Sequence, residues 1–364
     1  MTQRPIRCSV IRGGTSKGLY FHEPDLPSDV PTRDAVLLAA MGSPDAREID
    51  GMGGGHPLTS KVAVVRRSQR DDADVDYLFL QVWPDRGEVS DHQNCGNLLA
   101  GVGPFALEEG LVEARDVTTD VRVWMQNTRS LAVLRVETPG RLVTYDGDAS
   151  IDGVPGTSAP IPIEFLDIAG STCGSLLPTG HAADEVEGVR VTCIDNGMPV
   201  VCLRAEDVGL TGYEQPSDIE ANVEVCQRVE RLRLACGPLM NLGDVAKKTV
   251  PKMSLLAPAK NGGALTTRTF IPTRVHESIG VFGAVSVATA CLVPGSVAHE
   301  VAALSGPTSG VTLDVEHPSG YFSVSVDVTI ADGAVRVNSA ALLRTARLLM
   351  RGNVFVPSSV WGGP

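Results

Sequence analysis

The chain has 364 residues, about twice the usual size of one domain, which predicts two domains. Acidic side chains number 43 and basic side chains 31, giving a formal net charge of −12, and no run rich in Lys or Arg occurs. This charge balance argues against a nucleic-acid partner and against attachment to anionic membranes. The hydrophobic content of 43% is sufficient for buried cores and excludes a disordered chain.

The sequence predicts a cytoplasmic protein. Its first residues lead into a strand-like stretch without an apolar leader, and no uncharged apolar run is long enough to span a membrane. The eight cysteines are dispersed and include no C-x-x-C pair, so neither disulfides nor a zinc site are expected. The histidines show no metal-binding spacing, so we expect no metal.

Strands dominate the predicted secondary structure. The segments 61–65, 75–83, 121–124, 131–136, 189–194, 310–316 and 322–330 are short, β-branched and bounded by Gly, Pro or Asp. Amphipathic spacing predicts helices over 33–41, 217–235 and 340–350. The second of these begins with Ser217-Asp-Ile-Glu220, which has the form of a capping box.

Two further segments, 96–107 and 278–292, are apolar on every side and rich in Gly and Ala. Helices without a polar face must be buried all round, and these are too short to cross a bilayer. One such helix in each half predicts two similar α+β halves, each with strands around a central helix. Turn signals near 180–188 place the domains at 1–184 and 185–364, with the last ~20 residues packing back on the first domain. A ligand site is expected between the halves.

Two glycine-rich motifs resemble nucleotide-binding loops, but each lacks residues that such a loop requires. Arg12-Gly-Gly-Thr-Ser-Lys-Gly18 has glycines at phosphate-loop spacing, but Leu-Tyr follows instead of Lys-Ser/Thr. Gly51-Met-Gly-Gly-Gly55 lacks the strand and helix of a dinucleotide site. Tight turns account for the glycines, although not for the neighbouring Thr, Ser and Lys.

Lys61 stands where a polar loop becomes an apolar strand, in Pro57-Leu-Thr-Ser-Lys-Val-Ala63. Partial burial there would disfavour the ammonium form and leave a neutral amine able to remove a proton. The alternative is a solvated strand end.

Cys95 precedes the first apolar helix, in Asp91-His-Gln-Asn-Cys-Gly-Asn97. A helix start favours a thiolate, a substrate carboxylate or an enolate oxygen. The alternative is a small buried packing residue.

Short motifs rich in Gly, Ser, Thr and Asn extend over nearly the whole chain. They are Arg12-Gly-Gly-Thr-Ser-Lys-Gly18, Gly42-Ser-Pro-Asp45, Asp50-Gly-Met-Gly-Gly54, Pro57-Leu-Thr-Ser-Lys-Val-Ala63, Asn94-Cys-Gly-Asn97, Pro178-Thr-Gly180, Ile194-Asp-Asn-Gly-Met-Pro-Val200, Gly283-Ala-Val-Ser-Val-Ala-Thr-Ala290 and His317-Pro-Ser-Gly320. In this order they resemble the signature set of the PrpF-like isomerases. The stretches 93–105 and 195–199 are most similar to 4-oxalomesaconate tautomerases, with methylaconitate isomerases as close relatives.

The resemblance implies an α+β fold like that of diaminopimelate epimerase, with two pseudo-symmetric domains. It also implies a cofactor-free proton shift on an unsaturated tricarboxylate in aromatic acid catabolism, with a homodimer as one expected assembly. The family's lysine and cysteine carry over to Lys61 and Cys95 as catalytic residues. The expected substrate-binding residues are Thr15, Ser16, Thr59, Asn94, Gly96 and Asn97, with Asn196, Arg274 and Ser319 from the second domain.

One departure from the wider superfamily bears on the mechanism. Epimerases of this fold use two cysteines, one at each central helix. Here the second helix opens with His276-Glu-Ser278, and Cys291 lies at its far end. The sequence therefore favours a lysine–cysteine tautomerase or allylic isomerase over a two-thiol racemase. An aconitate-type double-bond isomerase and a non-catalytic polycarboxylate-binding protein are the alternatives.

Overall fold

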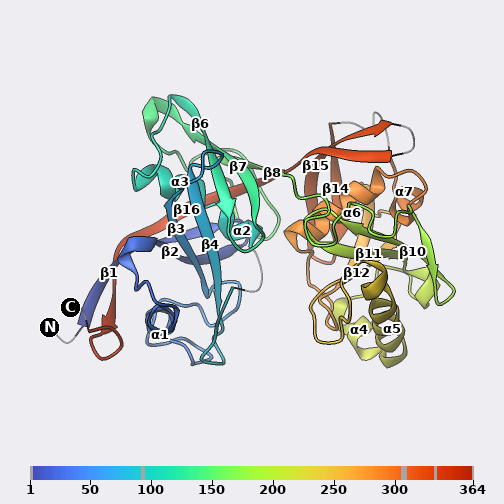
Figure 1. Ribbon diagram of the computed structural model, residues 1–364, viewed down its shortest axis with the longest axis horizontal. Helices are drawn as coiled ribbons and strands as arrows, with labels where there is room; N and C mark the ends of the chain where they lie inside the picture. The colour runs from blue at the N-terminus through green and yellow to red at the C-terminus, as the bar shows by residue number, and fades with distance from the viewer. Residues whose placement is uncertain (1–2, 92–94, 305–309, 332–333, 363–364) are drawn as a thin grey trace. The chain divides into compact units, whose positions relative to one another are not determined.

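The computed structural model describes residues 3–91, 95–304, 310–331 and 334–362, in two compact units (Figure 1). Unit 1 comprises residues 1–164 and 343–364, and unit 2 comprises residues 165–342. The sequence placed the boundary later, near residue 184. The division falls earlier because Phe165 already packs in unit 2, with its ring centroid 4.6 Å from that of Phe282. The long strand β16 (Ala334–Pro357) passes from unit 2 into unit 1 at Leu343.

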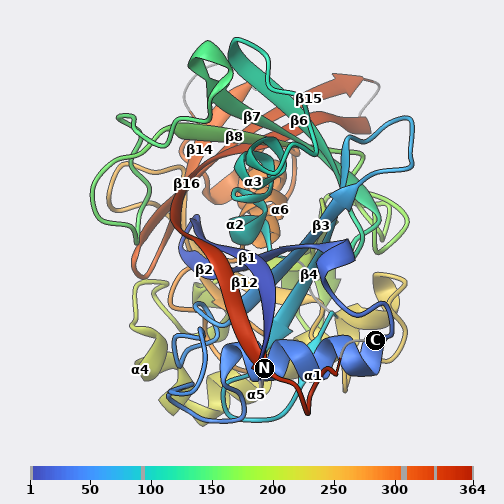
Figure 2. The ribbon, with the colours of Figure 1, turned by 90° about the vertical axis from the view of Figure 1, so that its left-hand side faces the viewer.

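Unit 1 is built on a ring of hydrogen-bonded strands. In order they are β1 (Gln3–Gly13), β2 (Ser16–His22), β3 (Lys61–Arg67), β4 (Val75–Val82), β6 (Val117–Met125), β7 (Ser130–Thr138), β8 (Pro160–Leu166) and β16, which pairs again with β1. The short β5 (Val89–Ser90) pairs with β4 outside this path. Closure of the ring leaves these strands without an open edge. Figure 2 shows the helices α2 (Gly96–Leu99) and α3 (Val102–Glu108) among the strands.

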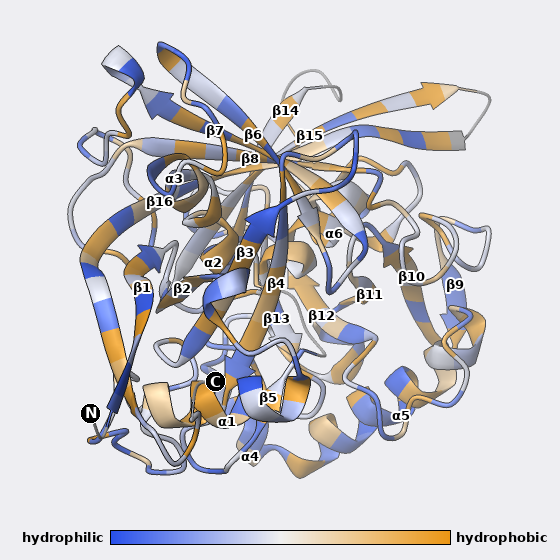
Figure 3. Cartoon of the chain, turned by 60° about the vertical axis from the view of Figure 1, so that its left-hand side comes forward, coloured by the Kyte–Doolittle hydropathy of each residue, from blue (hydrophilic) through white to orange (hydrophobic). Residues whose placement is uncertain are grey.

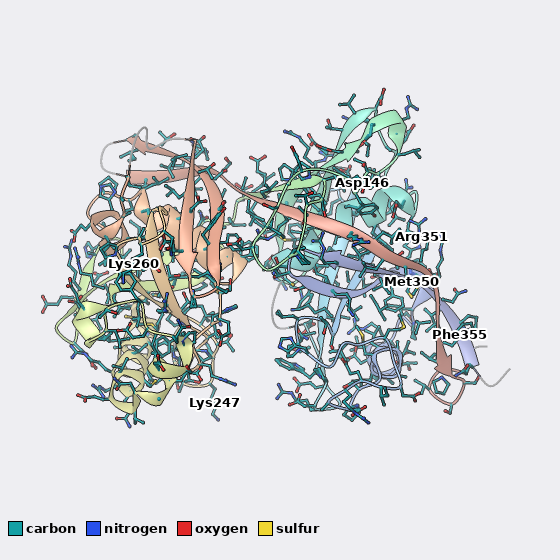
Figure 4. All side chains as sticks on the ribbon, turned by 180° about the vertical axis from the view of Figure 1, so that it is seen from behind. Asp146, Lys247, Lys260, Met350, Arg351 and Phe355 are labelled. Atoms are coloured by element: carbon teal, nitrogen blue, oxygen red, sulfur yellow. The ribbon has the colours of Figure 1, made fainter. Side chains whose placement is uncertain are left out.

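The first apolar segment was expected to form one helix, and it forms two. The chain breaks at Gly101, where an added Cβ would lie 2.4 Å from the Tyr20 hydroxyl. Restarting the helix places Pro104 in the first turn of α3, where its missing N–H costs no hydrogen bond. Every residue from Val102 to Leu107 is buried, as the lack of a polar face predicted. At its end Arg351 of β16, labelled in Figure 4, pairs with Glu108 at 2.6 Å.

The strands of unit 1 bury both faces, and each face has a different partner. Val62, Val64, Leu80 and Val82 pack in one core with the helix α1 (Val30–Met41). Because side chains alternate along a strand, Lys61 and Gln81 face the opposite way. That opposite face is the one that meets α2, since Tyr20 of β2 donates from its hydroxyl to the Leu98 carbonyl oxygen. Two 3-10 turns, Glu23–Asp25 and Pro139–Arg141, complete the unit.

Unit 2 follows a similar plan, and the pairings of its described strands form an open path and not a ring. Its strands run in the order β16, β15 (Gly320–Ala331), β14 (Val311–His317), β13 (Leu265–Phe270), β12 (Lys252–Ala257), β11 (Pro199–Arg204), β10 (Val189–Asp195) and β9 (Asp184–Val186). All eleven residues of the helix α6 (Val281–Cys291) are buried against β10, β11, β14, β15 and α7 (Val297–Val301). The prediction of strands around an apolar helix in each half is therefore confirmed, as is the α+β class.

The outer helices of unit 2 correct one detail of the sequence analysis. The expected helix 217–235 is two helices, α4 (Pro216–Ala221) and α5 (Val223–Leu239), beside the 3-10 turn Glu206–Val208. Figure 3 shows hydrophobic and hydrophilic segments alternating along α5, typical of a helix with one buried side. The prediction of a capping box is wrong. The Glu220 carboxylate accepts the Val275 N–H, and the long helix α5 is capped by the side chain of Asn222.

The prediction of a helix over 340–350 is also wrong, because this segment lies within β16. Its Ala, Leu, Arg and Met residues favour a helix, but pairing with β15 and β1 on either side of the unit boundary outweighs that preference. Leu342 and Arg344 are buried whereas Leu343 is exposed, as strand alternation requires. No helix in the described part of the chain is long and apolar enough to cross a membrane.

We expect Gly18→Ala to destabilise unit 1 by about 1–3 kcal/mol, because overpacking forces the backbone to shift. An added Cβ at Gly18 would lie 2.3 Å from the backbone oxygen of Lys61. Urea unfolding of the variant measures the change. Gly87→Ala is the matched control, since its Cβ would meet only Pro44 at 4.0 Å. Equal stability of the two variants would contradict this packing argument.

Candidate active site

Lys61 is the first residue of β3 and is not a solvated strand end. Its side chain is buried, with 8% of the residue exposed. The Nζ atom donates to Oε1 of Gln81 at 3.1 Å and lies 5.1 Å from the centroid of the Phe79 ring. Register explains this contact, because Lys61 of β3 stands directly opposite Gln81 of β4. In the part of the chain that the structure describes, the hydrogen-bond partner of the lysine amine is therefore a neutral amide.

Cys95 lies at the N-cap of α2 and is 8% exposed. Its Sγ atom accepts the Leu98 N–H at 3.4 Å, and its carbonyl oxygen accepts from the Tyr77 hydroxyl at 3.4 Å. Burial raises the pKa of both Tyr20 and Tyr77 well above the usual range, and the nearby Cys95 adds to each shift. Because α2 has only four residues, a helix dipole contributes little at this thiol.

Arg344 is a candidate site residue that the sequence analysis missed, because it assigned residues 340–350 to a helix. In β16 the side chain turns inward, and burial lowers the pKa of its guanidinium to about 9. A Cys95 thiolate would oppose that shift, which places the guanidinium within electrostatic range of the thiol. A cation destabilised by burial gains stability when an anion binds beside it.

Asn97 links Arg344 to the loop between β1 and β2. Its Oδ1 accepts from Nε of Arg344 at 3.1 Å, and its Nδ2 donates to Oγ1 of Thr15 at 3.1 Å. Arg12 holds the same loop, donating to the Gly14 and Thr345 carbonyl oxygens at 3.1 and 3.0 Å. Thus Arg12 is a structural residue of its motif, whereas Thr15 is exposed at the loop surface.

The glycine-rich loop before Lys61 is folded around a buried carboxylate, which the sequence analysis also missed. Glu48 accepts the Gly55 N–H at 2.7 Å and the Ser60 hydroxyl proton through the same oxygen, Oε2. An added Cβ at Gly53 would lie 2.2 Å from that carboxylate, and one at Gly54 would lie 2.3 Å from Oγ1 of Thr59. Close packing therefore explains these glycines without a dinucleotide.

Lys61 and Cys95 belong to the same interior side of unit 1. Gly18 stands opposite Lys61 in the β2–β3 register, and its absent side chain leaves room for Leu98, whose Cδ1 would lie 3.3 Å from a Cβ there. The strand that carries the amine and the helix that begins at the thiol thus pack directly on one another. Ser16 is buried nearby in β2, and its hydroxyl has no hydrogen-bond partner among the described residues.

The remaining predicted residues divide between the two units. Gly96 is buried as the first residue of α2, and Thr59 donates from its hydroxyl to the His56 carbonyl oxygen at 3.2 Å. Asn94 lies outside the described residues. In unit 2, Asn196 is fully buried, and its Nδ2 donates to Oγ1 of Thr289 on α6 at 2.8 Å.

Arg274 and Ser319 contact different parts of unit 2. Arg274 is exposed and pairs with Glu220 at 3.5 Å, whereas the Ser319 hydroxyl donates to the Glu277 carbonyl oxygen at 2.7 Å. Before α6 the Ser278 hydroxyl lies 3.1 Å from Nε2 of His317. At the far end of α6, burial raises the pKa of Cys291 well above the usual range, so this thiol is unsuited to proton transfer.

The described residues contain no group of three or more His, Cys, Asp or Glu side chains placed to hold a metal ion.

Comparison with known proteins agrees with the architecture and the motifs. The sequence profile of the family described as "PrpF protein" matches residues 3–357. The chain is 61% identical over 349 residues to a (4E)-oxalomesaconate Delta-isomerase of Novosphingobium sp. (strain KA1), covering 96% of this chain and 97% of that protein. It is 57% identical over 364 residues to a 4-oxalomesaconate tautomerase of Pseudomonas putida, covering 100% and 99%.

Solved structures confirm the expected fold. A methylitaconate-delta-isomerase aligns with a TM-score of 0.88 at 33% identity, covering 100% of this chain and 98% of that one. A hydroxyproline epimerase from Agrobacterium vitis aligns with a TM-score of 0.54 at 15% identity, covering 99% and 98%, which shows a shared fold alone.

Proposed function

Because the chain belongs to the PrpF family, we propose that it is an isomerase that moves a proton on 4-oxalomesaconate or a closely related unsaturated tricarboxylate. The observation that carries this proposal is a buried lysine on the same interior side of unit 1 as Cys95 and Arg344. A base, an acid and a fixed cation are the groups that such a proton shift requires.

The proposed reaction moves one proton within one molecule and changes no oxidation state overall. Lys61, as the neutral amine, removes a proton from a carbon made acidic by adjacent keto or conjugated carboxylate groups. The dienolate is stabilised by Arg344 and by the backbone N–H groups of Gly96 and Asn97. Cys95 then delivers a proton to a second position, and the resulting ammonium and thiolate return to amine and thiol by proton exchange with water. Alternatively, Cys95 stabilises the enolate while Lys61 returns its own proton to the second position.

Substrate binding needs a local positive site in a chain of net charge −12. In unit 1 we assign this role to Arg344, with Thr15, Ser16, Thr59, Asn94 and Asn97 as hydroxyl, amide or N–H donors to the carboxylates. The unpartnered, buried Ser16 hydroxyl supports this assignment, because buried polar groups are ordinarily hydrogen-bonded. Asn196, Arg274 and Ser319 of unit 2 stay predicted binding residues.

A second candidate function is a carbon–carbon double-bond isomerisation of an aconitate or methylaconitate. The likeness to a methylitaconate-delta-isomerase favours it, because the same base and acid can serve a 1,3-allylic shift. Assaying both substrate types side by side separates the two functions. A non-catalytic polycarboxylate-binding protein would be stabilised by the acid without exchanging its protons.

We further infer a cytoplasmic enzyme of aromatic acid breakdown that acts without a cofactor. The eight free cysteines support a reducing compartment. Cleavage of an oxygenated aromatic acid yields the unsaturated keto acids on which such a proton shift would act. A homodimer stays a prediction.

We expect Lys61→Met to lower turnover by about 10²–10⁴-fold, the usual contribution of a positioned general base. Substrate ultraviolet absorbance follows turnover, and nuclear magnetic resonance in deuterated water follows incorporation at carbon. Both signals should be lost together. The control is Lys247→Met, at an exposed lysine of unit 2 labelled in Figure 4. Retained deuterium exchange in Lys61→Met would exclude this residue as the base.

Cys95→Ser should also lower turnover, because a hydroxyl is a far weaker acid than a thiol. A loss of about 10²-fold or more would assign the thiol as proton donor. A loss of only a few fold would leave it as a supporting hydrogen-bond donor. Cys226→Ser, at a partly exposed thiol, is the control. Unchanged turnover in Cys95→Ser would remove the thiol from the mechanism.

Arg344→Gln should raise KM by about 10- to 100-fold, the value of a charged hydrogen bond to a substrate carboxylate. Steady-state kinetics over a range of salt concentrations should show that the variant has also lost much of the salt sensitivity of binding. Arg347→Gln makes the same charge change at an exposed position of β16 and should leave KM close to the parental value. Equal KM values for both variants would contradict the assignment of Arg344.

A further inference from the structure

We propose that Gln81 is a positioning residue for the reaction: its amide fixes the direction of the Lys61 amine while leaving that amine free to be neutral. This inference rests on the proposed function, in which Lys61 is the base. Gln81 belongs to none of the motifs that the sequence analysis singled out.

The environment of Gln81 determines which way its amide points. The residue is 1% exposed, and its Nε2 lies within hydrogen-bond distance of the carbonyl oxygens of Pro57, Ser60 and Val82, at 3.1, 3.0 and 3.1 Å. Rotating the amide by 180° would bring Oε1 against these three acceptors. Only one orientation is therefore favourable, and it aims Oε1 at Nζ of Lys61.

The same contacts connect the amide to the folded loop before β3. Ser60 accepts from Gln81 through its carbonyl oxygen and donates from its hydroxyl to the Glu48 carboxylate. Pro57 accepts from the other side of the loop. Gln81 is thus held by the segment that leads into Lys61, so that the amide and the amine are positioned together.

Among the described residues, one acceptor, Oε1 of Gln81 at 3.1 Å, sets the geometry of a neutral amine. When one N–H of Lys61 points to Oε1, the nitrogen lone pair must point away from the amide, because the amine is tetrahedral. The lone pair then occupies one of the two remaining positions on the nitrogen, both turned away from the amide oxygen, and a substrate C–H must approach from there. After proton uptake the ammonium still donates to Oε1, so the contact persists through the reaction.

The neutrality of the acceptor matters as much as its position. A carboxylate at this distance would favour the ammonium form by Coulomb attraction and would leave less of the reactive amine. The Phe79 ring lies 5.1 Å from the same nitrogen and carries no net charge. The Gln81 amide therefore orients the lysine without placing a negative charge beside it.

Other titratable groups face this side of unit 1, and the comparison of variants must hold them constant. They are Tyr20 from β2, Tyr77 from β4, Cys95 at α2 and Arg344 from β16, and Glu48 is bonded to Ser60 in the loop before β3. Burial keeps both tyrosines neutral, since it raises the pKa of each. All five are the same in the parent and in Gln81 variants, so a change in pH profile reports on position 81.

The test compares two substitutions that differ in charge. Gln81→Met removes the acceptor at similar volume, and we expect kcat to fall by about 10- to 100-fold with little change in KM, because the amine is misdirected. Gln81→Glu introduces a carboxylate, and we expect the acidic limb of kcat/KM to move upward by about 1–3 pH units. Gln3→Glu, at an exposed position of β1, is the matched charge control and should keep the parental profile.

A second measurement does not depend on turnover. A small amine-reactive acylating reagent labels only the neutral form of Lys61. Mass spectrometry of the peptide that contains Lys61 therefore reports the fraction of neutral amine at each pH. In Gln81→Glu the onset of labelling should move upward with the acidic limb. Should Gln81→Glu fail to fold, Gln81→Met still decides the matter through its kcat and KM.

The outcomes separate this inference from the proposed function. An active Lys61→Met variant overturns the proposed function whatever the Gln81 variants do. An inactive Lys61→Met variant together with parental kcat in Gln81→Met overturns the role of Gln81 alone.

Discussion

The structure of unit 1 depends on the close approach of its inner helix to the surrounding strands. Glycines make this approach possible: an added Cβ at Gly13 would lie 2.5 Å from the Asn97 carbonyl oxygen, and one at Gly18 would meet the backbone of Lys61. With no side chains between them, the start of α2 and the start of β3 pack against each other. The base and the thiol are brought to one side of unit 1 by this backbone contact.

The burial of two basic side chains in unit 1 follows from the same packing. Lys61 and Arg344 are both nearly excluded from water, and both are held by amide oxygens, of Gln81 and Asn97 respectively. An amide oxygen satisfies a buried donor without neutralising its charge. Neither of these two contacts brings a negative charge to the side chain that it holds.

The glycine-rich motifs have a structural explanation that a nucleotide interpretation does not provide. The glycines of residues 51–55 lie against the backbone of α1, the Glu48 carboxylate and Thr59. Arg12 and Glu48 bind main-chain and hydroxyl groups of the loops around them. These loops hold the predicted substrate-binding residues, and their rigidity comes from buried polar contacts within the loops.

The sequence by itself determined the short β-branched strands, the two buried apolar segments, and Lys61 at a strand start and Cys95 at a helix start, because local side-chain pattern and motif spacing carry that information. It did not determine the fate of residues 340–350, whose helical preference yields to strand pairing with distant partners. Arg344 meets Asn97 only because residues 340–350 adopt the strand conformation of β16. Gln81 meets Lys61 only through the register of β3 and β4. Contacts between residues far apart in the chain depend on how strands pair, and pairing is decided by the packing of the whole unit.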